Sequence, residues 1–306
     1  MRGSLSRGEL AEPKKITVQA GLRPTRRLAN AVMKQVFRVL TYVVVAVFAG
    51  IVLYIFVRAL PVLRLSFITE PPRHGMLEGG VSTCIYGTVA LLLLTSALAV
   101  PLGVAAAVYL NEFIGWGRRA RLVRAAVNNL AGVPSIVFGL FGLGFFVVFL
   151  HIGASLLAAS LTLAIVVLPI VIVSTEEALK AVPRDYRLGS AALGATRWQT
   201  ISKVTLPQAV PGIITGTILS IGRVAGETAP ILFTGAAFYL PHLPDHPRQQ
   251  FMELSYHIFA MATQASDITK SMPVAFGTTF VLIALVFAFN LIGILYRAKL
   301  RRRKAW

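Results

Sequence analysis

Two charged side chains stand alone inside an apolar stretch, SIGRVAGETAPILF, residues Ser220 to Phe233. Arg223 and Glu227 are four positions apart, which predicts neighbouring places on one face of a helix. A guanidinium offers an oxyanion a planar fork of charge-assisted donors, and a nearby carboxylate would weaken that hold enough for release. Thr228 and Thr234 could add hydroxyl donors. The alternative is that the two charges neutralise each other and join helices.

The composition indicates whether this pair lies in water or in a membrane. Of the 306 residues 56% are hydrophobic and only 14% are charged, and the mean hydropathy is +0.73. Soluble domains carry about 25% charged residues. Three long runs contain no charge: Gly79–Asn111, Ala125–Thr175 and Ser271–Tyr296. The sequence therefore predicts a membrane protein.

The number of spans follows from the length of these runs, because one bilayer crossing takes about 20 apolar residues. The first and third runs hold one span each, and the second holds two, hinged at His151–Gly153. Residues 39–60 add a first span, and Pro211–Thr234 adds the one with Arg223. The predicted fold is all-α with six transmembrane helices.

The basic residues predict the orientation of these helices. The net charge is +18, and six spans place 24 lysines and arginines on one side, 5 on the other and Arg223 inside the membrane. This asymmetry is the positive-inside rule, so both termini are predicted to be cytoplasmic. The charge thus orients the protein and gives no reason to expect a nucleic-acid partner. The one cysteine, Cys84, is predicted to be a small buried side chain in the second span.

The longest outer loop, residues 235–272, contains one periodic segment. Apolar residues recur there at helical spacing, and they are Phe251, Leu254, Ile258 and Met261. The pattern predicts a short amphipathic helix on the membrane surface. His242 and His246 lie in the same loop without a third matched ligand, so no metal site is predicted.

The loop on the cytoplasmic side, residues 175–208, predicts two short helices joined by a glycine turn. The first begins at Pro183, with Asp185 placed for the helix dipole. Leu188, Ala191 and Ala192 form its small apolar face. Gly194 supplies a left-handed residue at its end.

The second helix begins with a capping box, in which Thr196 is the N-cap and Gln199 reaches back. Trp198, Ile201 and Thr205 form one stripe, and Leu206–Pro207 is predicted to stop the helix. An ordinary linker does not need two capped helices. The loop is therefore predicted to be a docking surface.

The same loop is similar to the EAA motif of ABC importer permeases. Gly194, Val204, Leu206 and Pro207 fall on the spacing of that motif, whereas Leu188 stands where it has a glutamate and Gly189–Ser190 replaces its two alanines. In that family the loop inserts two coupling helices into a cleft of the ATP-binding subunit. The resemblance implies this role for residues 183–207.

Three further segments resemble the phosphate-specific importers, and their A-type permease subunit more than the paralogous C-type: Ala131–Phe146, Gly222–Thr234 and Tyr256–Gln264. The resemblance, which covers about 80–296, implies a type I ABC importer permease fold in the bacterial cytoplasmic (inner) membrane. It also implies the partners of such a subunit: a C-type permease paralogue, a pair of ATP-binding subunits, an external phosphate-binding protein and inorganic phosphate itself.

The chain is accordingly expected to divide into a basic cytoplasmic segment 1–38, a first helix 39–60, a permease core 80–296 with its coupling loop 175–208, and a basic tail 297–306. It contains no GxxxxGK[ST] motif and no Gly-Lys pair, so no directly bound cofactor is expected and a partner subunit must use ATP.

Other functions fit less well. An intramembrane enzyme needs paired catalytic groups, and the spans hold only one acid and one arginine. A secondary transporter has no use for a docking loop. Three alternatives stay open: the C-type subunit, a permease for another oxyanion such as sulfate, molybdate or phosphonate, and, less favoured, a secondary transporter.

Overall fold

The structure is a computed structural model, and it describes residues 24–303 apart from His74, Gly75, Leu77, Trp116, Pro241 and Ser266. The chain splits into two compact units, Met1–Tyr54 and Ile55–Trp306. In the first unit the described residues form the greater part of helix α1 (Pro24–Ala59), whose side chains from Leu28 to Tyr54 are almost all exposed. The apolar span predicted at 39–60 lies within α1, but the helix already begins at Pro24. Residues 1–23 of the predicted basic segment lie outside the described residues.

The second unit is helical apart from one short hairpin. Its outer elements are α2 (Leu65–Thr69), the antiparallel pair β1 (Pro72–Arg73) and β2 (Glu78–Gly79), and α11 (Leu254–Thr263). The long helices and their extensions are α3 (Ser82–Val108), η3 (Tyr109–Ile114), α4 (Arg118–Ala131), α5 (Ser135–Gly142), η4 (Leu143–Phe149), α6 (Leu156–Lys180), α9 (Leu206–Val224), α10 (Ala229–Thr234) and α12 (Ile268–Arg303). The loop between α6 and α9 holds α7 (Arg184–Ala192), α8 (Arg197–Thr200) and the π-helical turn η5 (Ile201–Thr205).

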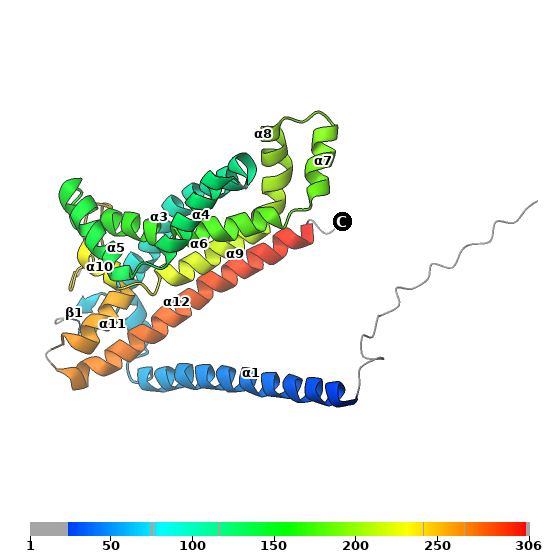
Figure 1. The fold of residues 1–306 in the computed structure, drawn as a ribbon. Helices are drawn as coiled ribbons and strands as arrows, with labels where there is room; N and C mark the ends of the chain where they lie inside the picture. The colour runs from blue at the N-terminus through cyan, green and yellow to red at the C-terminus, as the bar shows by residue number, and fades with distance from the viewer. Residues whose placement is uncertain are drawn as a thin grey trace, which may run out of the picture. The chain divides into compact units, whose positions relative to one another are not determined.

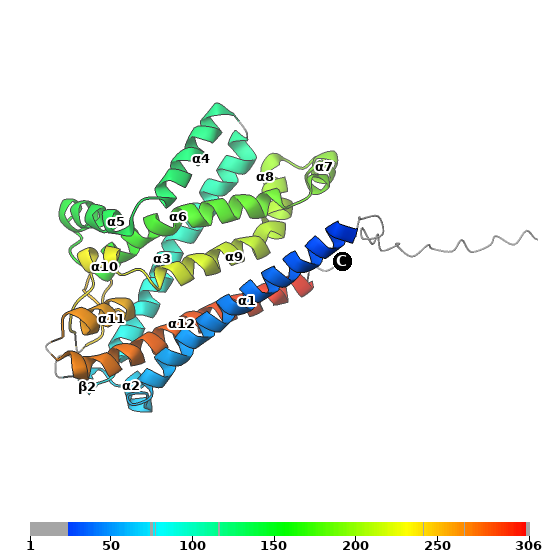
Figure 2. The same cartoon turned by 60° about the horizontal axis from the view of Figure 1, so that its bottom comes forward.

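Three helices form the centre of this unit, with α6 packed between α3 and α9 (Figure 1). Glycines let the backbones approach: a Cβ on Gly103 of α3 would lie 2.6 Å from Val171, and one on Gly212 of α9 would lie 2.5 Å from the Ala178 side chain. Small residues at such contacts are typical of membrane helices, whose association depends on close packing. α12 lies beside α9, and α11 packs on α12 (Figure 2).

The described residues contain five helices long and apolar enough to cross a membrane, or six if one bent pair is a single span. The predicted count of six is reached only with that pair. α4 and α5 with its extension η4 meet at 97°, so the span predicted in the first part of Ala125–Thr175 is broken. Pro134 explains the break, because a proline removes a backbone donor and disfavours helical geometry in the residue before it. The predicted hinge at His151–Gly153 is confirmed, since both of these residues have positive φ.

The predicted span Pro211–Thr234 is also wrong in detail. α9 ends at Val224, and a turn of four residues, Ala225–Thr228, leads into the separate helix α10. Pro230 lies in the first turn of α10, where its missing N–H costs nothing. The same ring would clash with the carbonyl of residue 226 if α9 continued. Arg223 therefore lies in the last helical turn before a break.

The coupling loop departs from the prediction at the other end of α9. Leu206–Pro207 does not stop the helix, because α8, η5 and α9 run on as one apolar helix, Arg197–Val224. The wider turn η5 ends at Thr205, two residues before Pro207. Changing the hydrogen-bond register there removes the α-helical bond that proline could not have made.

The helix predicted for the membrane surface is buried in the protein. α11 begins at Leu254, and Leu254, His257, Ala260 and Met261 are all buried. Phe251 precedes the helix and forms a parallel bridge with Ala236. The apolar stripe is real, but α12 and the start of α3 cover it in place of lipid.

Candidate functional site

The predicted pair exists, and it straddles the end of α9. The Nε atom of Arg223 lies 3.1 Å from Oε1 of Glu227, which belongs to the turn after the helix. The Arg223 side chain is 41% exposed and that of Glu227 only 13%. The terminal nitrogens of Arg223 make no hydrogen bond to any described residue, so most of the guanidinium fork is open to a ligand.

The two threonines predicted beside this pair differ. Thr228 is half-buried, directly after Glu227, and its side chain makes no capping bond to α10. Thr234 is fully buried, and its hydroxyl donates to the carbonyl of Pro230 at 2.8 Å. The hydroxyl hydrogen of Thr234 is thus used within α10, so Thr228 is better placed to donate to an anion beside Arg223.

The turn that carries Glu227 is fastened to α11 through Ser255. The Ser255 hydroxyl lies 3.2 Å from the Glu227 carbonyl and 2.6 Å from Oε2 of Glu253. Glu253 is the N-cap of α11 and accepts the Tyr256 N–H at 2.8 Å. Its Oε1 lies 3.4 Å from the Thr88 hydroxyl of α3. A single buried carboxyl group therefore joins α3, α11 and the turn beside Arg223.

Glu253 was missed by the sequence reasoning, because glutamate is not among the side chains that signal an N-cap. The side chain is 1% exposed, and its contacts in the described part of the chain include no cation. Burial raises the pKa of this carboxyl group above its ordinary value, against the smaller effect of its hydrogen bonds.

The hydroxyl hydrogens around Glu253 support the neutral form. Thr88 also lies 2.7 Å from the Cys84 carbonyl, and Ser255 also faces the Glu227 carbonyl. Two hydroxyl hydrogens thus face four acceptor oxygens. A proton on Glu253 turns one acceptor into a donor, and this lets Ser255 donate to the backbone of Glu227.

The coupling loop has the predicted local structure. α7 follows Pro183 and has Asp185 in its first turn, and Gly194 has φ of 78°, in the left-handed region. Thr196 and Gln199 form the capping box: the Thr196 N–H donates to Oε1 of Gln199 at 2.8 Å, and the Gln199 N–H donates back to Oγ1 of Thr196. The two helices and the turn between them protrude beyond the ends of α6 and α9 (Figure 1).

The loop residues divide into an exposed set and an anchoring set. Leu188, Ala191, Ala192 and Trp198 are exposed, as are Tyr186 and the 90% exposed Leu193, which the sequence reasoning missed. Ile201 and Thr205 are buried, and Val204, Leu206 and Pro207 are half-buried. The predicted stripe of Trp198, Ile201 and Thr205 is therefore wrong as one surface. Ile201 packs into a small core with Leu179 and Val182, whereas Trp198 points outward.

Arg187, which the sequence reasoning also missed, fixes α7 to the membrane helices. Its Nη2 atom donates to Oε1 of Glu112 at 3.0 Å and to the carbonyl of Leu179 at 2.9 Å, and its Nη1 atom donates to the carbonyl of Val182. Arg124 and Glu176, 3.0 Å apart, join α4 to α6 nearby. The loop is thus tied to the ends of α3 and α6 by charge as well as by packing.

Comparison with known proteins shows to which family the chain belongs. Residues 99–305 match the family described as "Binding-protein-dependent transport system inner membrane component". The chain is 32% identical to "Probable ABC transporter permease protein YqgI" of Bacillus subtilis over 87% of its own length and 94% of that protein. It is 38% identical to "Phosphate transport system permease protein PstA 1" of Mycobacterium tuberculosis over 76% of each chain.

Solved structures show the same fold at low identity. A MetNI methionine ABC transporter chain matches with a TM-score of 0.57 and 20% identity, over 72% of this chain and 97% of that one. A chain of a bacterial ABC transporter that imports alginate matches with a TM-score of 0.58 and 14% identity, over 92% and 100%. The predicted permease fold is therefore confirmed. The chain belongs to the family of binding-protein-dependent transport system inner membrane components, and it is a membrane-spanning permease subunit of an ABC transporter, not its ATPase.

Proposed function

We propose that this permease imports inorganic phosphate and that Arg223 binds the anion on its path. The observation that carries the proposal is the ion pair at the end of α9, in which Arg223 keeps its terminal nitrogens free while Glu227 holds only Nε. Relatives that cover most of the chain are named as phosphate permeases, which supports the choice of anion.

The chemistry of the pair suits transient binding. A guanidinium can donate two parallel hydrogen bonds to a phosphate that has lost its water shell. Glu227 takes part of the positive charge and keeps the anion from binding too tightly for release. The pair lies where α9 breaks, and the turn beside it is held by Ser255 to a different helix. A shift of α11 against α9 would therefore change the distance between Arg223 and Glu227.

Uptake of labelled phosphate in cells that depend on this complex tests the proposal. Arg223→Gln should abolish uptake at normal membrane levels, and Arg223→Lys should be poor because an ammonium lacks the planar fork. Arg223→Gln with Glu227→Gln should assemble and stay inactive. Arg248→Gln, at an exposed outer-loop arginine, is the matched control and should transport normally.

The outcomes separate the alternatives. Uptake near wild type in the double variant would falsify the anion-path role and leave a structural ion pair. Uptake of sulfate, molybdate or phosphonate in preference to phosphate would keep Arg223 in its role but change the substrate.

The proposal includes the subunits with which the chain works. These are a C-type permease paralogue, a pair of ATP-binding subunits that hydrolyse ATP, and an external phosphate-binding protein; the chain itself binds no cofactor. It also includes cytoplasmic termini. Labelling of single introduced cysteines should then find Thr200 inside and Pro244 outside.

The exposed residues of the coupling loop supply the contact with the ATP-binding subunit. Leu188 and Trp198 are 67% and 65% exposed although they are large and apolar. Trp198→Ala and Leu188→Asp should each reduce co-purification of that subunit. Phe287→Ala, at an equally exposed residue of α12 outside the loop, is the control and should not.

A further inference from the structure

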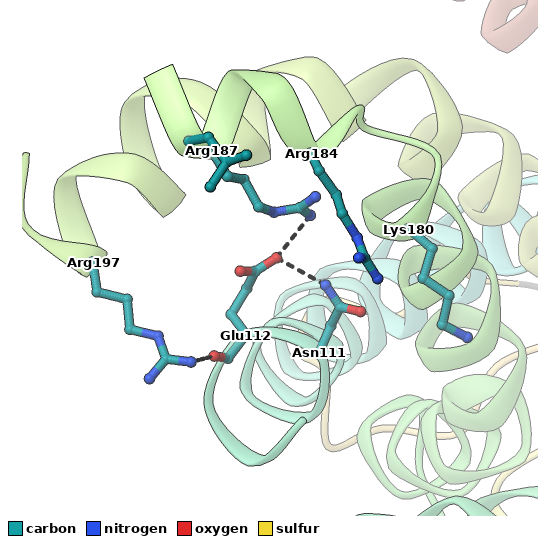
Figure 3. Close-up of a pocket in the computed structure, with 7 residues that line it drawn as sticks. Asn111, Glu112, Lys180, Arg184, Arg187 and Arg197 are labelled. Carbon is teal, nitrogen blue, oxygen red and sulfur yellow. Dashed lines mark hydrogen bonds and ion pairs between the residues drawn. The ribbon is translucent and has the colours of Figure 1, made fainter. Parts of the chain in front are cut away.

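A cavity that adjoins the coupling loop has no assigned role. Its volume is about 670 Å³, and Asn111, Glu112, Lys180, Arg184, Arg187 and Arg197 line it (Figure 3). These residues come from the end of α3 with η3, from the last turn of α6, and from both helices of the loop. The cavity therefore lies between a membrane span and the loop.

The charges in this cavity do not balance. One carboxylate, Glu112, faces four cationic side chains. Its Oε1 atom already accepts the amide of Asn111 at 2.8 Å and Arg187 at 3.0 Å. Lys180 has its own carboxylates outside the cavity lining, with Glu177 at 2.8 Å and Glu176 at 4.0 Å.

Two arginines remain without a counter-charge among the described residues. Arg197 donates to the backbone carbonyl of Glu112 and lies over the Phe113 ring, 5.1 Å from its centroid; neither contact is with an anion. Arg184 makes no hydrogen bond or ion pair with any described residue. Its side chain extends toward Asn111, into the space that Glu112 and Arg187 border (Figure 3).

We propose that this cavity binds a phosphate group, toward which Arg184 of α7 and Arg197 of α8 turn from either side of Glu112, and that the bound group links both helices of the coupling loop with Asn111 at the end of the α3 span. Two planar guanidinium groups suit a phosphate, and Asn111 can adjust to it as a neutral partner. Basic pockets between the cytoplasmic ends of membrane helices are also where anionic lipid headgroups bind. The group can come from such a headgroup or from free inorganic phosphate.

The consequence concerns coupling. Arg187 and the Arg197–carbonyl contact already join η3 to the loop. A bound phosphate would bridge Arg184 of α7 and Arg197 of α8 and accept from the Asn111 amide of η3, so its occupancy would stiffen the loop on which the ATP-binding subunit docks. If the group is free phosphate, the transported ion would act on its own importer from the far side of the membrane. This site is separate from the Arg223–Glu227 pair.

The test uses the purified complex of this chain with its C-type paralogue and the ATP-binding subunits, without the external phosphate-binding protein, and measures binding of inorganic phosphate by calorimetry. Every complex carries Arg223→Gln as well, so that binding at Arg223 does not contribute. This test therefore keeps its meaning even if phosphate is not the transported substrate. Arg184→Gln with Arg197→Gln should weaken phosphate binding at least about tenfold, the size expected for lost charge-assisted hydrogen bonds. Arg118→Gln removes an exposed cation of α4 that does not line the cavity and should change nothing.

A second arm distinguishes the sources. The same complexes are reconstituted into phosphatidylcholine vesicles with or without phosphatidylglycerol, and ATP hydrolysis is measured. Loss of a phosphatidylglycerol effect in the arginine double variant, with no phosphate binding by calorimetry, assigns the site to a lipid headgroup. Phosphate binding that the double variant weakens, without a lipid effect, assigns it to the free ion. If the double variant matches Arg118→Gln in both arms, the proposal is wrong and the arginines face solvent or a carboxylate of the ATP-binding subunit.

Discussion

Glu253 and Glu112 are both carboxyl groups that join separate helices, but they do so with opposite electrostatics. Glu253 is fully buried, touches only hydroxyls and one backbone N–H, and has no cation beside it among the described residues. Glu112 borders an open cavity and pairs with Arg187 at 3.0 Å. The first contact is a short-range hydrogen-bond network, and the second is an ionic one that stays near water.

The difference matches the task of each region. The outer cluster of Thr88, Glu253 and Ser255 holds the turn beside Arg223 in one place, and a neutral network does this without attracting or repelling an anion. The cluster around Glu112 holds the loop that is proposed to receive the ATP-binding subunit, and exposed charges remain available there. A charge in the outer cluster would therefore disturb the proposed substrate path, whereas a charge at the loop would not.

The largest effect is expected from removing the Glu253 carboxyl group. Glu253→Ala deletes the N-cap of α11 and leaves buried polar groups on Ser255 and Tyr256 unpaired, at a cost of about 3 kcal/mol in unfolding free energy. Glu253→Gln keeps a neutral acceptor and donor of the same shape and should cost less than about 1 kcal/mol. Thermal unfolding of the purified complex compares them. Equal losses in both variants would mean that the ionised form is the one the structure needs.

The next effect belongs to the ionic region. Arg187→Ala removes the bonds to Glu112, Leu179 and Val182 and should destabilise the attachment of α7 by about 2 kcal/mol. Co-purification of the ATP-binding subunit should fall, while phosphate binding at Arg223 stays unchanged. Arg119→Ala, at an exposed cation of α4, is the control. Unchanged assembly in Arg187→Ala would show that packing of Ile201 alone holds the loop.

The pH dependence of stability sharpens the contrast. Because the folded pKa of Glu253 is raised above 4.5, its contribution is fully present below about pH 4.5 and is lost as pH rises toward the folded pKa, by up to about 1.4 kcal/mol per pH unit. Burial lowers the pKa of His257 in α11 from 6.5 to about 4. The contribution of His257 to stability is therefore lost as the pH falls from about 6.5 toward 4. The difference between wild type and Glu253→Gln isolates Glu253, since His257 is present in both. A difference that does not change with pH would contradict the neutral form.

How much of this could be read from the sequence depends on whether the signal is local. The capping box at Thr196 and the left-handed Gly194 were predicted because their causes lie within a few residues. The burial of Glu253 was not, since it depends on Thr88 of a distant helix, and neither was the contact of Arg187 with Glu112. The break of α9 before Glu227 was missed because an apolar stretch with two glycines and one proline fits both a bent and a straight span.

The smallest effect tests how the coupling region holds its shape through the backbone. Gly189 and Gly194 both have open space where a Cβ would lie, but only Gly194 has a positive φ, of 78°. Gly194→Ala should therefore cost about 1 kcal/mol through backbone strain alone, whereas Gly189→Ala should stabilise α7 by a similar amount. The first change should weaken binding of the ATP-binding subunit by roughly fivefold, and the second should preserve or strengthen it. Because neither methyl group would touch a described residue of this chain, opposite signs in the stability of the loop come from the backbone. Equal behaviour of the two variants would mean that the turn between α7 and α8 reshapes on docking, and that the loop relies on its ionic anchor at Arg187.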